Sequence, residues 1–240
     1  MAEQRRPAQP RCLRLRGLQA ECTRRGTGLG APVGDVPDRP RQVCPVRGRR
    51  CAHCAIVYLT PFFPAGSNHR YDAATFEGVD PLLGGDAALI DLVAAAHARG
   101  MKVGGDLTAN HSVSSHEWFQ RALTDPAAPE AGYYHFSPDY SSYESWRGVP
   151  SLPKFNWASA GLCEAYTTGE DSVVAHWLKP PFNLDGWRLD VGNMAGRLGA
   201  QDVNHEVATL IRDRVVAVNP DALLLGEPTS DAGPDADGSG

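Results

Sequence analysis

From residue 55 onward, short apolar runs alternate with longer segments of helical apolar spacing, and this alternation leaves the chain few possible folds. The predicted strands are short, apolar and bounded by turn residues, and they cover residues 56–59, 101–107, 186–191 and 222–225. The predicted helices cover residues 86–99, 171–178 and 202–218. Alternation of this kind indicates parallel strands joined by crossover helices. The sequence therefore predicts an α/β fold, either a doubly wound sheet or a (β/α)8 barrel.

Glycine, proline and aromatic residues refine this outline. Asp86 or Gly85 is expected to cap the first helix, and Gly104 and Gly105 leave room for close packing inside the second strand. Residues 112–160 lose the alternation and carry ten aromatic residues. A structureless loop of this length is improbable, so we expect a small inserted subdomain with its own aromatic packing.

Residues 1–54 differ from the rest of the chain in charge and cysteine content. They hold twelve arginines, no lysine and four acidic residues, a local charge of +8, whereas residues 55–240 carry −13. Five of the six cysteines also lie before residue 55. Cys44, Cys51, His53 and Cys54 are zinc-ligand types, but the spacing C-x6-C-x-H-C matches no common zinc finger.

Three interpretations of residues 1–54 stay open. One is a zinc site, and another is an arginine-rich arm that binds nucleic acid, although aromatic residues for base stacking are absent. We favour a segment without stable structure, because it lacks a useful apolar period and its composition resembles translation in a wrong reading frame. Residues 232–240, rich in Asp, Gly and Pro, read as a disordered tail.

Each predicted strand leads into polar residues. These clusters are Asn68 to Asp72, then Asp106 with Asn110 and His111, then Arg188 with Asp190, and finally Glu227. In a parallel barrel the carboxyl ends of all strands lie on one face, so the clusters would converge there. A Rossmann dinucleotide site has little support, because no glycine pair shows the G-x-G-x-x-G spacing.

Two carboxylates in one site suggest glycosidic bond cleavage. Asp190 lies two residues after Arg188, on the same face of the strand, and an adjacent cation favours the ionised form that a nucleophile needs. Glu227 follows an apolar run, and an apolar setting with a neighbouring carboxylate would keep it protonated as an acid. Tyr71 would stack on a sugar ring and His111 would bond its hydroxyls. Taken singly, each of these four residues could instead have a purely structural role, such as capping a helix or packing in the core.

Taken together, these residues resemble the α-amylase family of glycoside hydrolases, family 13. Residues 106–111, 185–191 and 224–227 are similar to its first three signatures. Residues 151–157, with the form Pro-Lys-x-Asn, resemble a motif near the end of domain B on the neopullulanase, cyclomaltodextrinase and α-glucosidase-like side of the family. Residues 68–72 look like the loop whose His and Tyr line the sugar subsite.

The resemblance implies a retaining glycosidase acting on α-glucans, maltooligosaccharides or cyclodextrin-like substrates. Asp190 would be the nucleophile and Glu227 the acid/base. The substrate-binding residues would be His69, Tyr71, Asp72, Asp106, His111 and Arg188. No cofactor is required, although the family often binds calcium through an Asn placed like Asn110. We expect a cytoplasmic protein without a membrane span, and nucleic acid is not an expected partner.

The resemblance also implies a partial (β/α)8 barrel. The predicted strands correspond to strands two to five, with strands two and three in residues 55–111, a domain B-like insertion in residues 112–160, and strands four and five in residues 161–231. A first strand, strands six to eight and the fourth signature are not recognised. Met194 also stands where the family often has a polar residue. An alternative to an active glycosidase is therefore a catalytically inactive fragment of one.

Overall fold

The computed structural model describes residues 56–229 of the 240-residue chain. The expectations for residues 1–54, including a zinc site at Cys44, Cys51, His53 and Cys54 or an arm for nucleic acid, lie outside the described residues. The expectation of a disordered tail over residues 232–240 lies outside them as well. Within residues 56–229, no helix combines the length and the apolar character that a membrane crossing requires.

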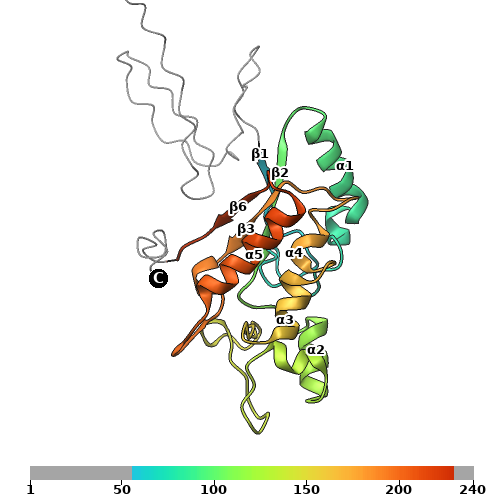
Figure 1. Cartoon of the computed structure of the whole chain (residues 1–240). Coiled ribbons are helices and arrows are strands. Elements are labelled where there is room, and N and C mark those ends of the chain that lie inside the picture. Colours follow the sequence, from blue (N-terminus) through green and yellow to red (C-terminus); the bar gives the residue numbers. More distant parts are fainter. Residues whose placement is uncertain (1–55, 230–240) are drawn as a thin grey trace, which may run out of the picture. The chain divides into compact units, whose positions relative to one another are not determined.

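Four parallel strands form the main sheet, in the order β1-β2-β3-β6 (Figure 1). Their bounds are Ile56–Tyr58 for β1, Lys102–Thr108 for β2, Gly186–Asp190 for β3 and Leu223–Gly226 for β6. All three pairings are parallel, and each of the four predicted strands is confirmed to within one residue at either end. Within the described residues, β1 and β6 each leave one edge of the sheet unpaired.

The three predicted helices are present, with changes at their ends. Their bounds are Gly85–His97 for α1, Val173–His176 for α4 and Asn204–Val218 for α5. The predicted cap of α1 is wrong, because Gly84, in the left-handed conformation at φ 98°, is the N-cap. The Asp86 carboxylate instead accepts a hydrogen bond from the backbone N–H of Val79 at 2.8 Å. The segment of α4 is shorter than predicted and ends before Pro180, which cannot continue a helix.

Several short elements escape prediction from the sequence. The helices are α2 (Glu117–Thr124), α3 (Ala160–Cys163) and a π-helical turn, η4 (Glu164–Thr168); the 3-10 turns are η1 (Pro81–Leu83), η2 (Pro129–Tyr133), η3 (Trp146–Gly148) and η5 (Gly192–Met194); β4 (Arg197–Leu198) and β5 (Gln201–Asp202) pair antiparallel. Most are a single turn, too short to show an apolar period. In α2 the signal is present, because the buried Phe119 and Ala122 are three residues apart.

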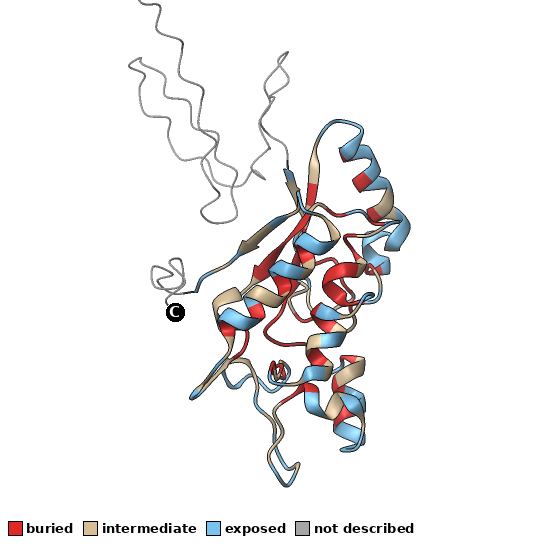
Figure 2. Cartoon of the chain, in the orientation of Figure 1, coloured by how far each residue is buried: buried red, intermediate tan, exposed pale blue. Residues whose placement is uncertain are grey.

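One hydrophobic core joins the sheet, the helices and the insertion (Figure 2). Trp118 of the insertion lies 5.7 Å from Phe76, and Phe155 lies 5.8 Å from Tyr166, between ring centroids. The insertion also packs rings of its own against one another, as expected, for example Phe119 against Tyr134 with centroids 4.9 Å apart, while its other rings extend the common core. In Figure 1 the insertion extends past the carboxyl ends of the strands.

Gly105 shows why β2 requires glycine at this position. A Cβ atom there would lie 2.6 Å from the Trp187 ring and 3.0 Å from Phe62. The expected close packing is confirmed at Gly105, where the Trp187 ring packs against β2.

Candidate active site

Asp106 on β2 and Arg188 on β3 meet at the carboxyl end of the sheet. They are register partners in the parallel pairing, so their side chains leave the sheet on the same side. Arg188 Nη1 donates to Asp106 Oδ2 at 2.6 Å, and the exposed fractions of the two side chains are 5% and 0%. This buried ion pair fixes the guanidinium at the sheet.

The same guanidinium contacts both carboxylates that the sequence singles out. Arg188 Nη1 lies 3.3 Å from Asp190 Oδ1, and Nη2 lies 2.7 Å from Glu227 Oε2. Asp190 ends β3, and Glu227 directly follows β6. One cation therefore gathers three carboxylates from three neighbouring strands. We refer to Asp106, Arg188, Asp190 and Glu227 as the carboxylate cluster.

Two tyrosines complete the surroundings of Asp106. The hydroxyls of Tyr58 and Tyr71 both donate to Asp106 Oδ2, that of Tyr71 at 2.9 Å. Burial raises the pKa of Asp106 in spite of these hydrogen bonds. Burial and the negative charge of Asp106 raise the pKa of Tyr71 to about 12, so its hydroxyl remains a donor at neutral pH. Asp106 has no exposed surface, so it is shielded from solvent. Its hydrogen-bond partners are Arg188 and the two tyrosines.

The protonation of Asp190 differs from the expectation based on its neighbour. Burial, followed by the negative charge of Asp106, raises the pKa of Asp190 to about 7, although Arg188 lowers it. Glu227 adds a further negative charge. Arg188 favours the ionised form, as the sequence predicts, but burial and the neighbouring carboxylates outweigh its effect.

Glu227 also has other surroundings than the sequence predicts. Its Oε2 accepts hydrogen bonds from Arg188 and, at 3.0 Å, from the backbone N–H of Val191, and 36% of the side chain is exposed. The expectation of an apolar setting for Glu227 is wrong, because the leucine run lies within β6 and Glu227 lies beyond the end of this strand. Val191 has φ 40° and ψ 43°, a left-handed conformation that is rare for a β-branched residue. This turn directs its N–H toward Glu227.

The loop over residues 68–72 brings Tyr71 against the carboxylate cluster. Arg188 Nη1 donates to the Tyr71 hydroxyl at 3.2 Å. His69 is exposed and stacks on Tyr71, with ring centroids 6.0 Å apart and planes at 27°. Asp72 is buried and accepts a hydrogen bond from the Ser67 hydroxyl, so it stabilises the bend of the loop.

His111 and Asn110 follow β2 and border the insertion. His111 Nδ1 lies 3.1 Å from Asn110 Nδ2, and the His111 ring stacks on Trp146 with centroids 6.0 Å apart. Burial, assisted by the charge of Lys154, lowers the pKa of His111 to about 4, so the ring is neutral near pH 7. The Asn110 side-chain oxygen accepts a hydrogen bond from Lys154 Nζ. The atom expected to bind calcium is thus engaged by an ammonium group.

Three residues of this region were not identified as site residues from the sequence. They are Tyr58, Trp146 and Lys154. Tyr58 reads as part of an apolar strand, and its hydroxyl was the only sign that a polar partner must lie nearby. Trp146 lies in the irregular insertion, where no apolar periodicity predicts which way a side chain points. Lys154 was visible within the Pro-Lys-x-Asn motif, but its partner Asn110 lies 44 residues away.

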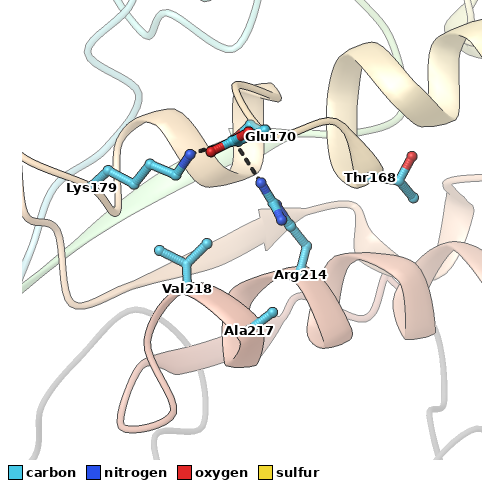
Figure 3. A pocket seen from close by; sticks show the side chains of 6 residues that line it. All are labelled: Thr168, Glu170, Lys179, Arg214, Ala217 and Val218. Carbon is cyan, nitrogen blue, oxygen red and sulfur yellow. Dashed lines mark hydrogen bonds between the residues drawn. The ribbon is translucent and has the colours of Figure 1, made fainter.

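A separate pocket of about 460 Å³ lies between α5 and the segment around α4 (Figure 3). Lys179 Nζ and Arg214 Nη2 each donate to the Glu170 backbone oxygen at 2.6 Å. No member of the carboxylate cluster lines this pocket. Both of its cations thus bind the chain's own backbone.

Comparisons with known proteins agree with this geometry. Residues 53–233 match the family model described as alpha amylase, catalytic domain. The chain is 33% identical over 185 residues to a cyclomaltodextrinase of Geobacillus thermopakistaniensis, covering 74% of this chain and 29% of that protein. It is 30% identical to an intracellular maltogenic amylase of Bacillus subtilis, covering 71% of this chain and 28% of that protein.

Solved structures give the same result. A debranching enzyme from Nostoc punctiforme superposes with a TM-score of 0.61 at 33% identity, covering 74% of this chain and 36% of that chain. The chain thus spans about three tenths of the length of these curated relatives and a little over one third of this structure. Because the family model covers most of the chain, and the relatives include glycoside hydrolases, this chain belongs to the alpha-amylase family.

Proposed function

We propose that the carboxylate cluster is the catalytic centre of a retaining glycoside hydrolase acting on α-glucosidic linkages. The observation that carries this proposal is the single guanidinium of Arg188, which contacts Asp106, Asp190 and Glu227 together. Two partly exposed carboxylates beside a buried third are suited to a reaction that needs a nucleophile and an acid at one bond.

In the proposed mechanism the ionised Asp190 attacks the anomeric carbon of the sugar. The glycosidic C–O bond breaks as Glu227 transfers its proton to the leaving oxygen, which leaves a glycosyl ester on Asp190. Glu227, now ionised, removes a proton from water, and the water oxygen attacks the anomeric carbon and releases Asp190. A second sugar hydroxyl in place of water would give transfer rather than hydrolysis.

The remaining predicted site residues support this reaction in two ways. His69, Tyr71 and His111 are proposed to contact the sugar, by stacking or by hydrogen bonds to its hydroxyls. Arg188 and Asp106 are proposed to position Asp190 and Glu227, since both are buried. Asp72 is proposed to act through the loop, because its carboxylate bonds to Ser67.

The four-stranded sheet is proposed to be strands two to five of a (β/α)8 barrel, and residues 112–160 its domain B. The parallel order β1-β2-β3-β6 and the family match support this assignment. The proposed substrates are α-glucans, maltooligosaccharides or cyclodextrins, as the names of the cyclomaltodextrinase and the amylopullulanase relatives suggest. A cytoplasmic location remains a prediction, which fractionation of the source cells would check.

The test compares two substrates with different leaving groups. Maltodextrin needs a proton donor, whereas a nitrophenyl α-maltoside releases a phenolate that does not. Asp190→Ala should abolish release from both substrates, and Glu227→Gln should abolish release from maltodextrin while retaining the first step on the aryl maltoside. The first-formed sugar should have the α configuration by NMR.

The matched control is Asp213→Asn, which changes an exposed carboxylate of α5 that pairs with Arg212. It should leave both reactions unchanged. Sugar release that persists in Asp190→Ala, or a β-configured product, would rule out the proposed mechanism.

A further inference from the structure

Lys154 is a buried lysine at the junction of three loops. Its exposed fraction is 4%, and its Nζ donates to the Asn110 side-chain oxygen and, at 3.0 Å, to the Met194 backbone oxygen. Asn110 follows β2, Met194 follows β3, and Lys154 lies near the end of the insertion. The ammonium group therefore connects the insertion to two loops of the sheet.

The bonds that stabilise this cation come from neutral groups. Within residues 56–229, Lys154 takes part in no ion pair. A buried charge is costly unless it is well bonded, so its oxygen partners must compensate. The face of Trp146 adds a cation–π contact, with Nζ 5.8 Å from the ring centroid.

These surroundings do not fit a calcium ion. Calcium prefers six to eight oxygen ligands, usually with several carboxylates. No group of three or more His, Cys, Asp or Glu residues in the described part of the chain is arranged to hold a metal. The ammonium also occupies the Asn110 oxygen, and it would repel a divalent cation at the same position.

We propose that the Lys154 ammonium replaces the calcium ion that the family often binds, as a fixed cation linking the insertion to the loops after β2 and β3. A side-chain amide oxygen and a backbone carbonyl oxygen are ligands that calcium accepts, and here they accept from one covalently attached cation. The chain is accordingly stable without calcium.

The link also bears on the proposed site. The backbones of His111 and Lys154 form an antiparallel bridge, and Asn110 contacts the His111 ring at 3.1 Å. Lys154 is thus a positioning residue for His111. The proposal itself does not depend on turnover, because its test measures unfolding and calcium binding, so it can fail or hold independently of the glycosidase reaction.

The first experiment uses the whole chain, stripped with EDTA and then supplied with millimolar calcium chloride. Circular dichroism records the unfolding temperature, and titration calorimetry records calcium binding. We expect no calcium binding and the same unfolding temperature in both conditions. Stoichiometric calcium binding, or a rise in unfolding temperature with calcium, would overturn the proposal.

The second experiment changes the cation. Lys154→Met should lower the unfolding temperature by about 5 °C or more, with or without calcium. The matched control is Lys102→Met, because Lys102 is partly exposed and donates to the Asp221 backbone oxygen at 3.0 Å; it should change the temperature little. An equal effect of both substitutions would contradict the proposal.

A third variant tests whether these oxygens form a cation site. Lys154→Asp places a carboxylate beside the Asn110 and Met194 oxygens, so calcium should raise its unfolding temperature by several degrees relative to EDTA. If calcium has no effect on a folded Lys154→Asp chain, these oxygens are not a cation site and the proposal fails. If this variant does not fold, the wild-type measurement and Lys154→Met decide.

Discussion

Arg188 is a single cation that contacts all three carboxylates of the cluster. Three carboxylates compete for its guanidinium, at 2.6 Å for Asp106, 3.3 Å for Asp190 and 2.7 Å for Glu227. The longest of these distances is the one to Asp190, whose pKa is raised to about 7, with burial as the first cause. Asp190 therefore titrates near neutrality.

This titration gives a pH dependence of stability with a definite sign. Between about pH 4 and pH 7 the native state keeps a proton on Asp190 that the unfolded state has lost, so the free energy of unfolding falls as pH rises through this interval. Asp190→Asn should reduce the slope. Urea unfolding across this pH range measures it, and Asp213→Asn, an exposed carboxylate, should keep the wild-type slope. An unchanged slope in Asp190→Asn would contradict the raised pKa.

Tyr58 allows a test of the hydrogen bonds to Asp106. Tyr58→Phe removes a donor from a fully buried carboxylate, so the free energy of unfolding should fall by about 1–3 kcal/mol. Tyr143→Phe is the control, because its hydroxyl donates to the neutral Pro150 backbone oxygen at a partly exposed position and should cost about 1 kcal/mol or less. Chemical denaturation of both variants gives the comparison. Equal losses would mean that the Asp106 bond has no special weight.

At the scale of elements, the contact between β2 and β3 positions the cluster. The two strands pair in register from Gly104 with Gly186 to Thr108 with Asp190. Close packing of Trp187 against Gly105 sits within this pairing, one residue before Arg188. An error in the packing of this pair would shift Arg188 relative to Asp106.

Gly105→Ala tests this contact directly. The added Cβ would lie 2.6 Å from the Trp187 ring, so the ring or the strand must move, at a cost of about 1–3 kcal/mol in unfolding free energy. Gly226→Ala is the control, since a Cβ at this position of β6 meets no atom within 4 Å. Thermal unfolding should show a loss for Gly105→Ala only. A loss of similar size in both would attribute the effect to the backbone rather than to Trp187.

At the scale of the whole molecule, the sheet ends where the proposed barrel would continue. Within the described residues, β1 and β6 each have an unpaired edge, and Ile56 and Leu223 at these edges are each 39% exposed. Edges of this kind are normally covered by a further strand. Residues 56–229 by themselves would accordingly supply only part of the wall that a closed barrel forms around a sugar.

A chimera would show whether this segment works within a complete barrel. Residues 56–229 would replace the matched segment of the Geobacillus cyclomaltodextrinase, which is 33% identical over 185 residues. We expect the chimera to hydrolyse cyclodextrin at least about 100-fold faster than the 240-residue chain alone, because the substrate is positioned from all sides. Equal and measurable rates of cyclodextrin hydrolysis would show that the chain is sufficient by itself.

The chimera needs its own negative control. Asp190→Ala within the chimera should be inactive, and the exposed Asp213→Asn should not change the rate. Activity of the Asp190→Ala chimera would assign the nucleophile to another residue. An inactive but folded wild-type chimera would support the alternative of a segment without catalytic function.

The sequence by itself determined the strands, the longer helices and the positions of Asp106, Arg188, Asp190 and Glu227 at strand ends. Periodicity is a local property, and a strand end fixes which residues reach the face of the sheet. The sequence did not reveal the short elements of the insertion, because a single helical turn shows no apolar period. Several aromatic rings of the insertion also pack on parts of the core that are distant in the sequence.

Only the tertiary structure decided the charge states and the partners. The hydroxyl of Tyr58 meets Asp106 across 48 residues of chain, and Lys154 meets Asn110 across 44. The pKa of Asp190 depends on burial and on carboxylates from neighbouring strands, neither of which its sequence neighbour Arg188 reveals. Burial and electrostatic interaction depend on distance in space, and that distance exists only once the strands have paired.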